Sequence, residues 1–158
     1  MASGEPAGWR FLFREEQGLI DAPTWRRGLV ALAAPMVAMT LIWWWLLPFA
    51  NRDLSERAFV DPMTIVVYAY LLVYAAAIML AAVCFYFLSV KRWRDLARPP
   101  GLAGLPLLAA LVDGAAHWVQ PRVSEAMPYW TVVVLDVVLI AIVVWTAREL
   151  GARPSRDD

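Results

Sequence analysis

Cysteine and histidine, the residues that build most metal and redox centres, are nearly missing from this sequence. Its 158 residues include one cysteine, Cys84, and one histidine, His117. A single cysteine excludes a disulfide within the chain, and neither residue stands in the spacing of zinc or haem ligands. We therefore expect no metal site and no cofactor, and we interpret Cys84 as a small apolar residue within a helix.

Charge is scarce as well. Only 18% of the residues are charged, and 14 basic residues balance 14 acidic ones, whereas soluble domains carry about 25% charged residues. A chain without net charge has no general electrostatic attraction for nucleic acid, so we expect no nucleic-acid partner. No nucleophile accompanies an acid–base pair in any recognisable pattern. We therefore expect no catalytic residues and interpret the protein as a non-enzyme.

Apolar residues, in contrast, make up 61% of the chain and gather in four long runs, at residues 29–50, 64–90, 102–119 and 130–147. About 20 apolar residues, rising about 1.5 Å each, cross the hydrocarbon core of a bilayer. A soluble domain of this size could not bury four such runs. The sequence predicts an all-α membrane protein, with four transmembrane helices in an antiparallel bundle and the lipid bilayer as its partner.

The basic residues predict how the chain is oriented. All but three of the 14 lie in residues 1–28, in the gap between the second and third runs, or in the tail at 148–158. Short loops rich in Lys and Arg stay in the cytoplasm. We therefore expect both termini in the cytoplasm and residues 51–63 and 120–129 on the outside.

The segment before the first run is rich in aromatic residues. Trp9 and Phe13 flank Phe11 and Leu12, and such a stretch is typical of a segment that lies along the membrane interface. We expect residues 1–28 to form this cytoplasmic, interfacial segment. Asp21 or Thr24 could cap the start of the first long helix.

A few polar side chains fall inside the predicted helices. Asp113 and Asp136 lie at similar depths in an antiparallel hairpin, His117 lies one helical turn from Asp113, and Tyr70 and Tyr74 lie at comparable depth. A charge in the middle of a transmembrane helix costs about 2.5–3.5 kcal/mol. The cluster therefore has two interpretations, a proton or ion site, or hydrogen bonds that fix the packing of the helices.

A basic stretch follows the second run. Its charged residues are Lys91, Arg92, Arg94, Asp95 and Arg98. Basic residues beside a membrane attract anionic headgroups by about 1 kcal/mol each, and the same surface could bind another protein. Asp95 could pair with Arg92 or Arg98 and order the turn.

This stretch also carries a resemblance. With the aromatic segment and Gly18 before the first helix, the ordered residues Arg92, Asp95, Arg98 and Gly101 resemble the hairpin motif of the YhaH-like family of small bacterial inner-membrane proteins, whose function is unknown. Ala97 stands where that family has a glycine. The resemblance implies a multi-pass protein of the bacterial inner membrane and implies no activity.

The sequence favours a non-enzymatic accessory or assembly component of the membrane, which would contact other membrane proteins or a second copy of itself. The alternative is a small proton- or cation-coupled transporter or channel that uses the intramembrane carboxylates. A lipid-modifying enzyme is disfavoured, because Arg92, Asp95 and Arg98 could grip a phosphate headgroup but have no nucleophile beside them.

Overall fold

The computed structural model describes residues 8–50 and 62–155. These residues form helices and no strand: α1 (Trp9–Phe13), α2 (Ala22–Ala50), α3 (Pro62–Asp95), η1 (Pro100–Gly104), α4 (Leu105–Val119), η2 (Gln120–Arg122) and α5 (Tyr129–Ala152). Four helical segments are long and apolar enough to cross a membrane, and they pack against one another. The predicted all-α fold with four transmembrane helices is confirmed. The loop predicted at 51–63 lies almost entirely outside the described residues.

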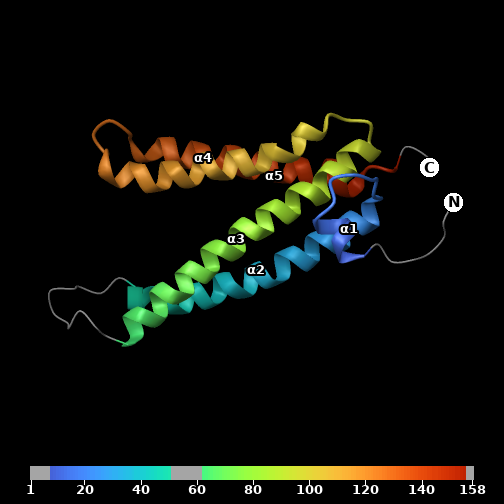
Figure 1. The fold of residues 1–158 in the computed structure, drawn as a ribbon. Coiled ribbons are helices and arrows are strands. Elements are labelled where there is room, and N and C mark those ends of the chain that lie inside the picture. Colours follow the sequence, from blue (N-terminus) through green and yellow to red (C-terminus); the bar gives the residue numbers. More distant parts are fainter. Residues whose placement is uncertain (1–7, 51–61, 156–158) are drawn as a thin grey trace.

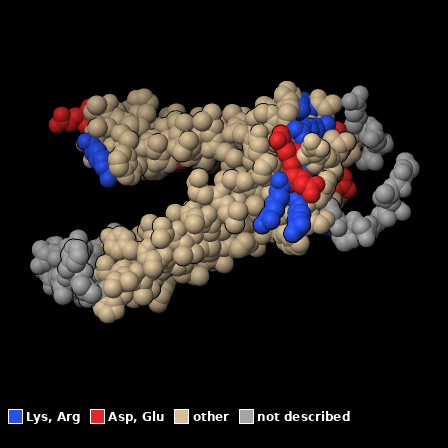
Figure 2. Space-filling view, in the orientation of Figure 1, with Lys and Arg blue, Asp and Glu red and all other residues tan. Residues whose placement is uncertain are grey.

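The four long helices form two antiparallel hairpins. α2 packs along α3, and α4 packs along α5 (Figure 1). The hairpins meet at one end of the molecule, which we call the basic end, where α2 begins, α3 ends and α5 ends. Toward the other end, the distal end, the two hairpins diverge like the arms of a V (Figures 1 and 2). Within residues 8–50 and 62–155, the bundle is therefore closed at one end and open at the other.

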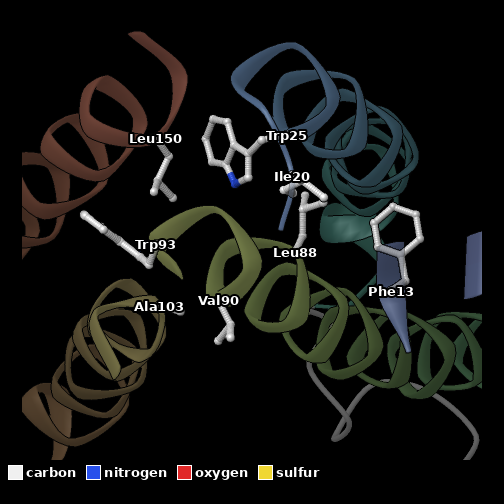
Figure 3. Close-up of a cluster of buried hydrophobic side chains, with 8 residues drawn as sticks. All are labelled: Phe13, Ile20, Trp25, Leu88, Val90, Trp93, Ala103 and Leu150. Atoms are coloured by element: carbon white, nitrogen blue, oxygen red, sulfur yellow. The ribbon is translucent and has the colours of Figure 1, made fainter. Parts of the chain in front are cut away.

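The buried core lies at the basic end (Figure 3). Its eight apolar residues come from five elements and the loop before α2: Phe13, Ile20, Trp25, Leu88, Val90, Trp93, Ala103 and Leu150. Along the arms the apolar side chains point outward, as Leu72 does with 73% of its surface exposed. That pattern suits helices surrounded by lipid, where apolar exposure has no cost.

The N-terminal segment packs against the helices at the basic end, and its predicted position at the membrane interface stays a prediction. Phe13 and Ile20 are buried in the core, whereas Trp9 stays exposed. α1 packs against α3, so the segment is part of the fold. Of the two candidate caps for the first long helix, Asp21 has the role, because its Oδ1 accepts a hydrogen bond of 3.0 Å from the Thr24 N–H.

α3 continues past its apolar run and stops at a defined backbone motif. Ala97 adopts a left-handed conformation with φ 53°. The Ala97 N–H bonds to Arg94 O at 2.9 Å, and the Arg98 N–H bonds to Trp93 O at 2.9 Å. These two bonds form a Schellman motif, which satisfies the last carbonyls of a helix. The prolines at 99 and 100 then prevent any continuation.

Candidate intramembrane polar site

α4 and α5 bring three of the predicted polar residues together. The His117 Nε2 atom lies 3.1 Å from Asp136 Oδ1 and 4.0 Å from Asp113 Oδ2. One donor atom from each of the three side chains lies within 4.8 Å of the others. Asp113 and His117 sit one turn apart on α4, so a single face of that helix presents both to Asp136 on α5.

The three side chains differ in burial. The Asp113 side chain is only 12% exposed, and its Oδ1 atom is buried without a hydrogen-bond partner among the described residues. The side chains of His117 and Asp136 are 49% and 40% exposed. The site therefore has a closed side at Asp113 and an open side at the other two residues.

The depth of the site follows from helix geometry. Asp113 precedes the last residue of α4, Val119, by six positions. At 1.5 Å per residue it lies about 9 Å inside the distal end of the helix. Asp136 lies seven positions after the first residue of α5, Tyr129, at nearly the same depth. If the helices span a bilayer, the three polar groups lie within its hydrocarbon core.

The two predicted tyrosines belong to the other hairpin. The Tyr70 hydroxyl donates to Met39 O at 2.5 Å, and the Tyr74 hydroxyl lies 2.8 Å from Thr40 Oγ1. Their rings stack with centroids 6.1 Å apart. These bonds tie α3 to α2, and none of them joins the tyrosines to the Asp113 site.

The basic stretch forms a second polar network, centred on Arg92. Its side chain is fully buried and pairs with Asp95. Its Nε donates to Leu150 O at 3.0 Å, one terminal nitrogen donates to Ser155 Oγ at 3.0 Å, and the other donates to Arg153 O. Ser155 Oγ in turn donates to Asp95 Oδ2 at 2.9 Å. The guanidinium therefore caps the carbonyls at the end of α5 and locks that end onto α3.

The neighbours of Arg92 point to the N-terminal segment instead, because successive helical residues are about 100° apart. Lys91 is buried, donates to Leu12 O at 3.0 Å, and lies 5.1 Å from the centre of the Phe11 ring. Arg94 pairs with Glu16 at 3.0 Å. The last turn of α3 therefore contacts both the N-terminal segment and the end of α5 and holds them together.

Among the predicted headgroup or partner contacts, Lys91 and Arg92 make internal bonds, whereas Arg94 and Arg98 keep 32% and 42% of their side chains exposed. The sequence interpretation missed Glu149 and Ser155. Glu149 bonds Arg153 at 2.8 Å and approaches Arg98 at 3.9 Å. The spacing of four residues between Glu149 and Arg153 is a local signal for their ion pair. No such signal marks Ser155, because its partners Arg92 and Asp95 lie about 60 residues away in the sequence.

Apolar cavities follow the boundary between the hairpins. One of about 160 Å³ lies between them near the basic end, lined by Trp25, Leu29, Phe85, Pro106, Val143, Thr146 and Ala147. A groove of about 310 Å³ on α2 and α3 shares Leu29 and Phe85 with it, and its other lining residues are Leu32, Ala33, Met36, Tyr74, Ile78, Ala81 and Ala82. The groove therefore continues from the junction along the face of α2 and α3 that borders the V.

Comparison of the chain with protein-family models, with curated proteins and with solved structures found no match in any of the three. The resemblance to the YhaH-like family is therefore neither supported nor opposed, and it stays a prediction.

Proposed function

We propose that this multi-pass membrane protein is a non-enzymatic accessory or assembly component of a bacterial inner membrane, with both termini in the cytoplasm. In this role its V receives a transmembrane helix, either from another membrane protein or from a second copy of the chain. The observation that carries the proposal is the open V, whose arms, in the described residues, are joined at the basic end and diverge from it (Figure 2).

The chemistry of the groove supports this role. Three alanines, Ala33, Ala81 and Ala82, lie among its lining residues. Transmembrane helices associate through close van der Waals contact at small residues, because lipid gives them no hydrophobic reason to pair. A groove with small side chains beside the junction of the arms is therefore a favourable surface for a further helix.

The rigidity of the junction also supports the role. The Arg92 network, the pair of Arg94 with Glu16 and the buried core hold the basic end together. The two arms therefore project from a fixed base. An accessory protein that positions a partner helix benefits from such a base, because less conformational entropy is lost on binding.

Site-specific photocrosslinking in cell membranes tests the proposal. A photoreactive amino acid at Ala81 lies in the groove. The matched control is Leu72, nine residues earlier on α3, which is about half a turn round the helix and highly exposed. At Ala81 we expect a discrete crosslink to one protein, which mass spectrometry identifies and which also co-purifies with this chain without crosslinking. At Leu72 we expect only lipid adducts. Lipid adducts alone at both positions would contradict the proposal.

A second candidate function rests on the polar site. Asp113, His117 and Asp136 converge within 4.8 Å, at a depth where ionisable groups in other membrane proteins mark ion and proton pathways. We propose as the alternative a small proton- or cation-coupled transporter or channel.

Flux measurements in proteoliposomes test the alternative. We expect the Asp113→Asn and Asp136→Asn variants to abolish proton or cation flux that the parent protein supports. Tyr70→Phe is the control, because Tyr70 bonds to α2 and lies outside the three-residue site. An absence of flux in the parent chain, or equal flux in all variants, rules this function out.

A further inference from the structure

The geometry points to a binding site for one divalent transition-metal ion at Asp113, His117 and Asp136, with Zn²⁺ as the representative ion. Two ligands come from α4 and one from α5, so a bound ion would join the two helices in the distal half of their hairpin. The inference is independent of both proposed functions, because an ion can bind here whether or not it moves and whether or not a partner occupies the V.

The distances suit such an ion. Zinc bonds of about 2.0–2.2 Å place tetrahedral ligands about 3.4 Å apart and octahedral ligands about 3.0 Å apart. His117 Nε2 and Asp136 Oδ1 are already 3.1 Å apart, and Asp113 Oδ2 lies 4.0 Å from the same nitrogen. A side-chain shift of about 1 Å at Asp113 would complete the ligand set, which is well within rotamer adjustment.

An unpartnered oxygen provides an independent reason to place a ligand here. Only 12% of the Asp113 side chain is exposed, and its buried Oδ1 atom has no hydrogen-bond partner within residues 8–50 and 62–155. A buried polar atom without a partner costs about 1–3 kcal/mol. An ion bound by both oxygens of the Asp113 carboxylate would supply the missing interaction.

Charge and ligand type favour a divalent transition metal. Two ionised aspartates with a neutral imidazole carry a charge of −2, which a low-dielectric medium strongly disfavours. One divalent cation brings the total to zero. A mixed set of one imidazole and two carboxylates suits Zn²⁺, Mn²⁺ or Fe²⁺ better than the soft ion Cu⁺, which prefers sulfur, or than Ca²⁺ and Mg²⁺, which prefer oxygen alone.

The open side of the site agrees with this assignment. His117 and Asp136 are about half exposed, in contrast to Asp113. Three protein ligands leave zinc one further coordination position, which in other proteins holds an exchangeable ligand such as water. The partial exposure of His117 and Asp136 leaves room for that further ligand.

Metal titration of the full chain in nanodiscs tests the inference. Protein stripped by a chelator is titrated with Zn²⁺ by calorimetry and with Co²⁺ by visible absorption. We expect one saturable ion per chain and the intense visible bands of low-coordinate Co²⁺. Asp113→Asn, His117→Gln and Asp136→Asn should each weaken binding by at least about tenfold, because even outer-shell changes cost about 10–100-fold.

Glu125→Gln is the matched control. Glu125 is an exposed carboxylate in the loop before α5, so its loss should leave the affinity unchanged. Failure of the parent chain to bind, or equal binding by the control and the three ligand variants, would overturn the inference.

X-ray absorption at the zinc edge keeps the test decisive if a variant does not fold. On the parent protein we expect an imidazole signature within a shell of nitrogen and oxygen. A fully hydrated ion would overturn the assignment. Zinc binding without ion flux would rule out the transport function and leave the metal site standing.

Discussion

At the residue scale, burial separates two arginines that are only six positions apart. Arg92 is fully buried, and every nitrogen of its guanidinium donates to a carboxylate, a hydroxyl or a carbonyl. Arg98 keeps 42% of its side chain exposed and makes one long contact with Glu149. The guanidinium of an arginine directs five N–H donors outward in one plane and so can bond acceptors on several sides, whereas the three donors of a lysine share a single nitrogen. Similar charges in one stretch therefore have different structural consequences.

We expect Arg92→Ala to lower the free energy of unfolding by about 3–5 kcal/mol, because it leaves Asp95 and the last carbonyls of α5 without their partner. Titration with a denaturing detergent in mixed micelles, followed by circular dichroism, measures the change. Arg98→Ala is the control and should cost less than about 1 kcal/mol, as exposed ion pairs do. Equal losses in the two variants would contradict the assigned role of Arg92.

At the element scale, the start of α2 and the end of α3 each depend on one residue whose contribution to stability can be measured. Asp21 caps the start of α2, and hydrogen bonding from the Thr24 side chain is the largest cause that lowers the pKa of the Asp21 carboxyl. The lowered pKa means that the folded state favours the ionised carboxylate. The stabilisation is therefore complete above the pKa of the unfolded chain, about 3.9, and is lost as the pH falls through the lower folded-state value.

We expect Asp21→Ala to cost about 0.5–2 kcal/mol at neutral pH, toward the lower end because the residue is exposed. The difference between parent and variant should shrink below about pH 4. Asp21→Ser preserves a capping oxygen without a titrating group, so its stability should lack this acid-dependent component. Unfolding curves across the acid range measure all three proteins, and an unchanged difference down to the lowest pH would exclude the cap as its source.

The end of α3 contains a residue in an unfavourable backbone conformation. Ala97 has φ 53° within the Schellman motif, and a left-handed conformation costs a non-glycine residue about 1–2 kcal/mol. We expect Ala97→Gly to raise the free energy of unfolding by about 1 kcal/mol, after the greater flexibility of glycine in the unfolded chain is subtracted. Ala97→Val should lower it. Detergent-unfolding midpoints give both values, and a decrease for the glycine variant would contradict this account.

At the scale of the whole molecule, the charged ends and the bare arms predict the topology. Figure 2 shows most of the visible charged side chains at the basic end, a smaller group at the distal tip of the arm formed by α4 and α5, and almost none along the arms. By the positive-inside rule we expect the basic end to face the cytoplasm. We expect a fluorescent protein fused after the C-terminus to fluoresce, and alkaline phosphatase inserted at Glu125 to be active. The reverse pattern would show that the chain is inverted.

The open shape itself could not be predicted from the sequence. A compact four-helix bundle and a V with a closed base have the same apolar runs, because run length and hydropathy do not report which helix faces are in contact. The different burial of the Arg92 and Arg98 side chains could not be predicted either, because it also depends on which helix faces are in contact. The convergence of Asp113, His117 and Asp136 could be anticipated only in depth, since the rotation of α4 against α5 decides whether the side chains meet.

Four apolar helices long enough to cross a membrane could be predicted from the amino-acid sequence, because hydropathy and helix rise add along the chain. The sequence also marked where polar groups enter those helices. Three further features emerged from the packing of the helices: the hairpins join at one end, Arg92 is buried while Arg98 is not, and one Asp113 oxygen has no partner among the described residues. These outcomes depend on helix rotation and on backbone carbonyls from distant segments, which no local pattern of residue types encodes.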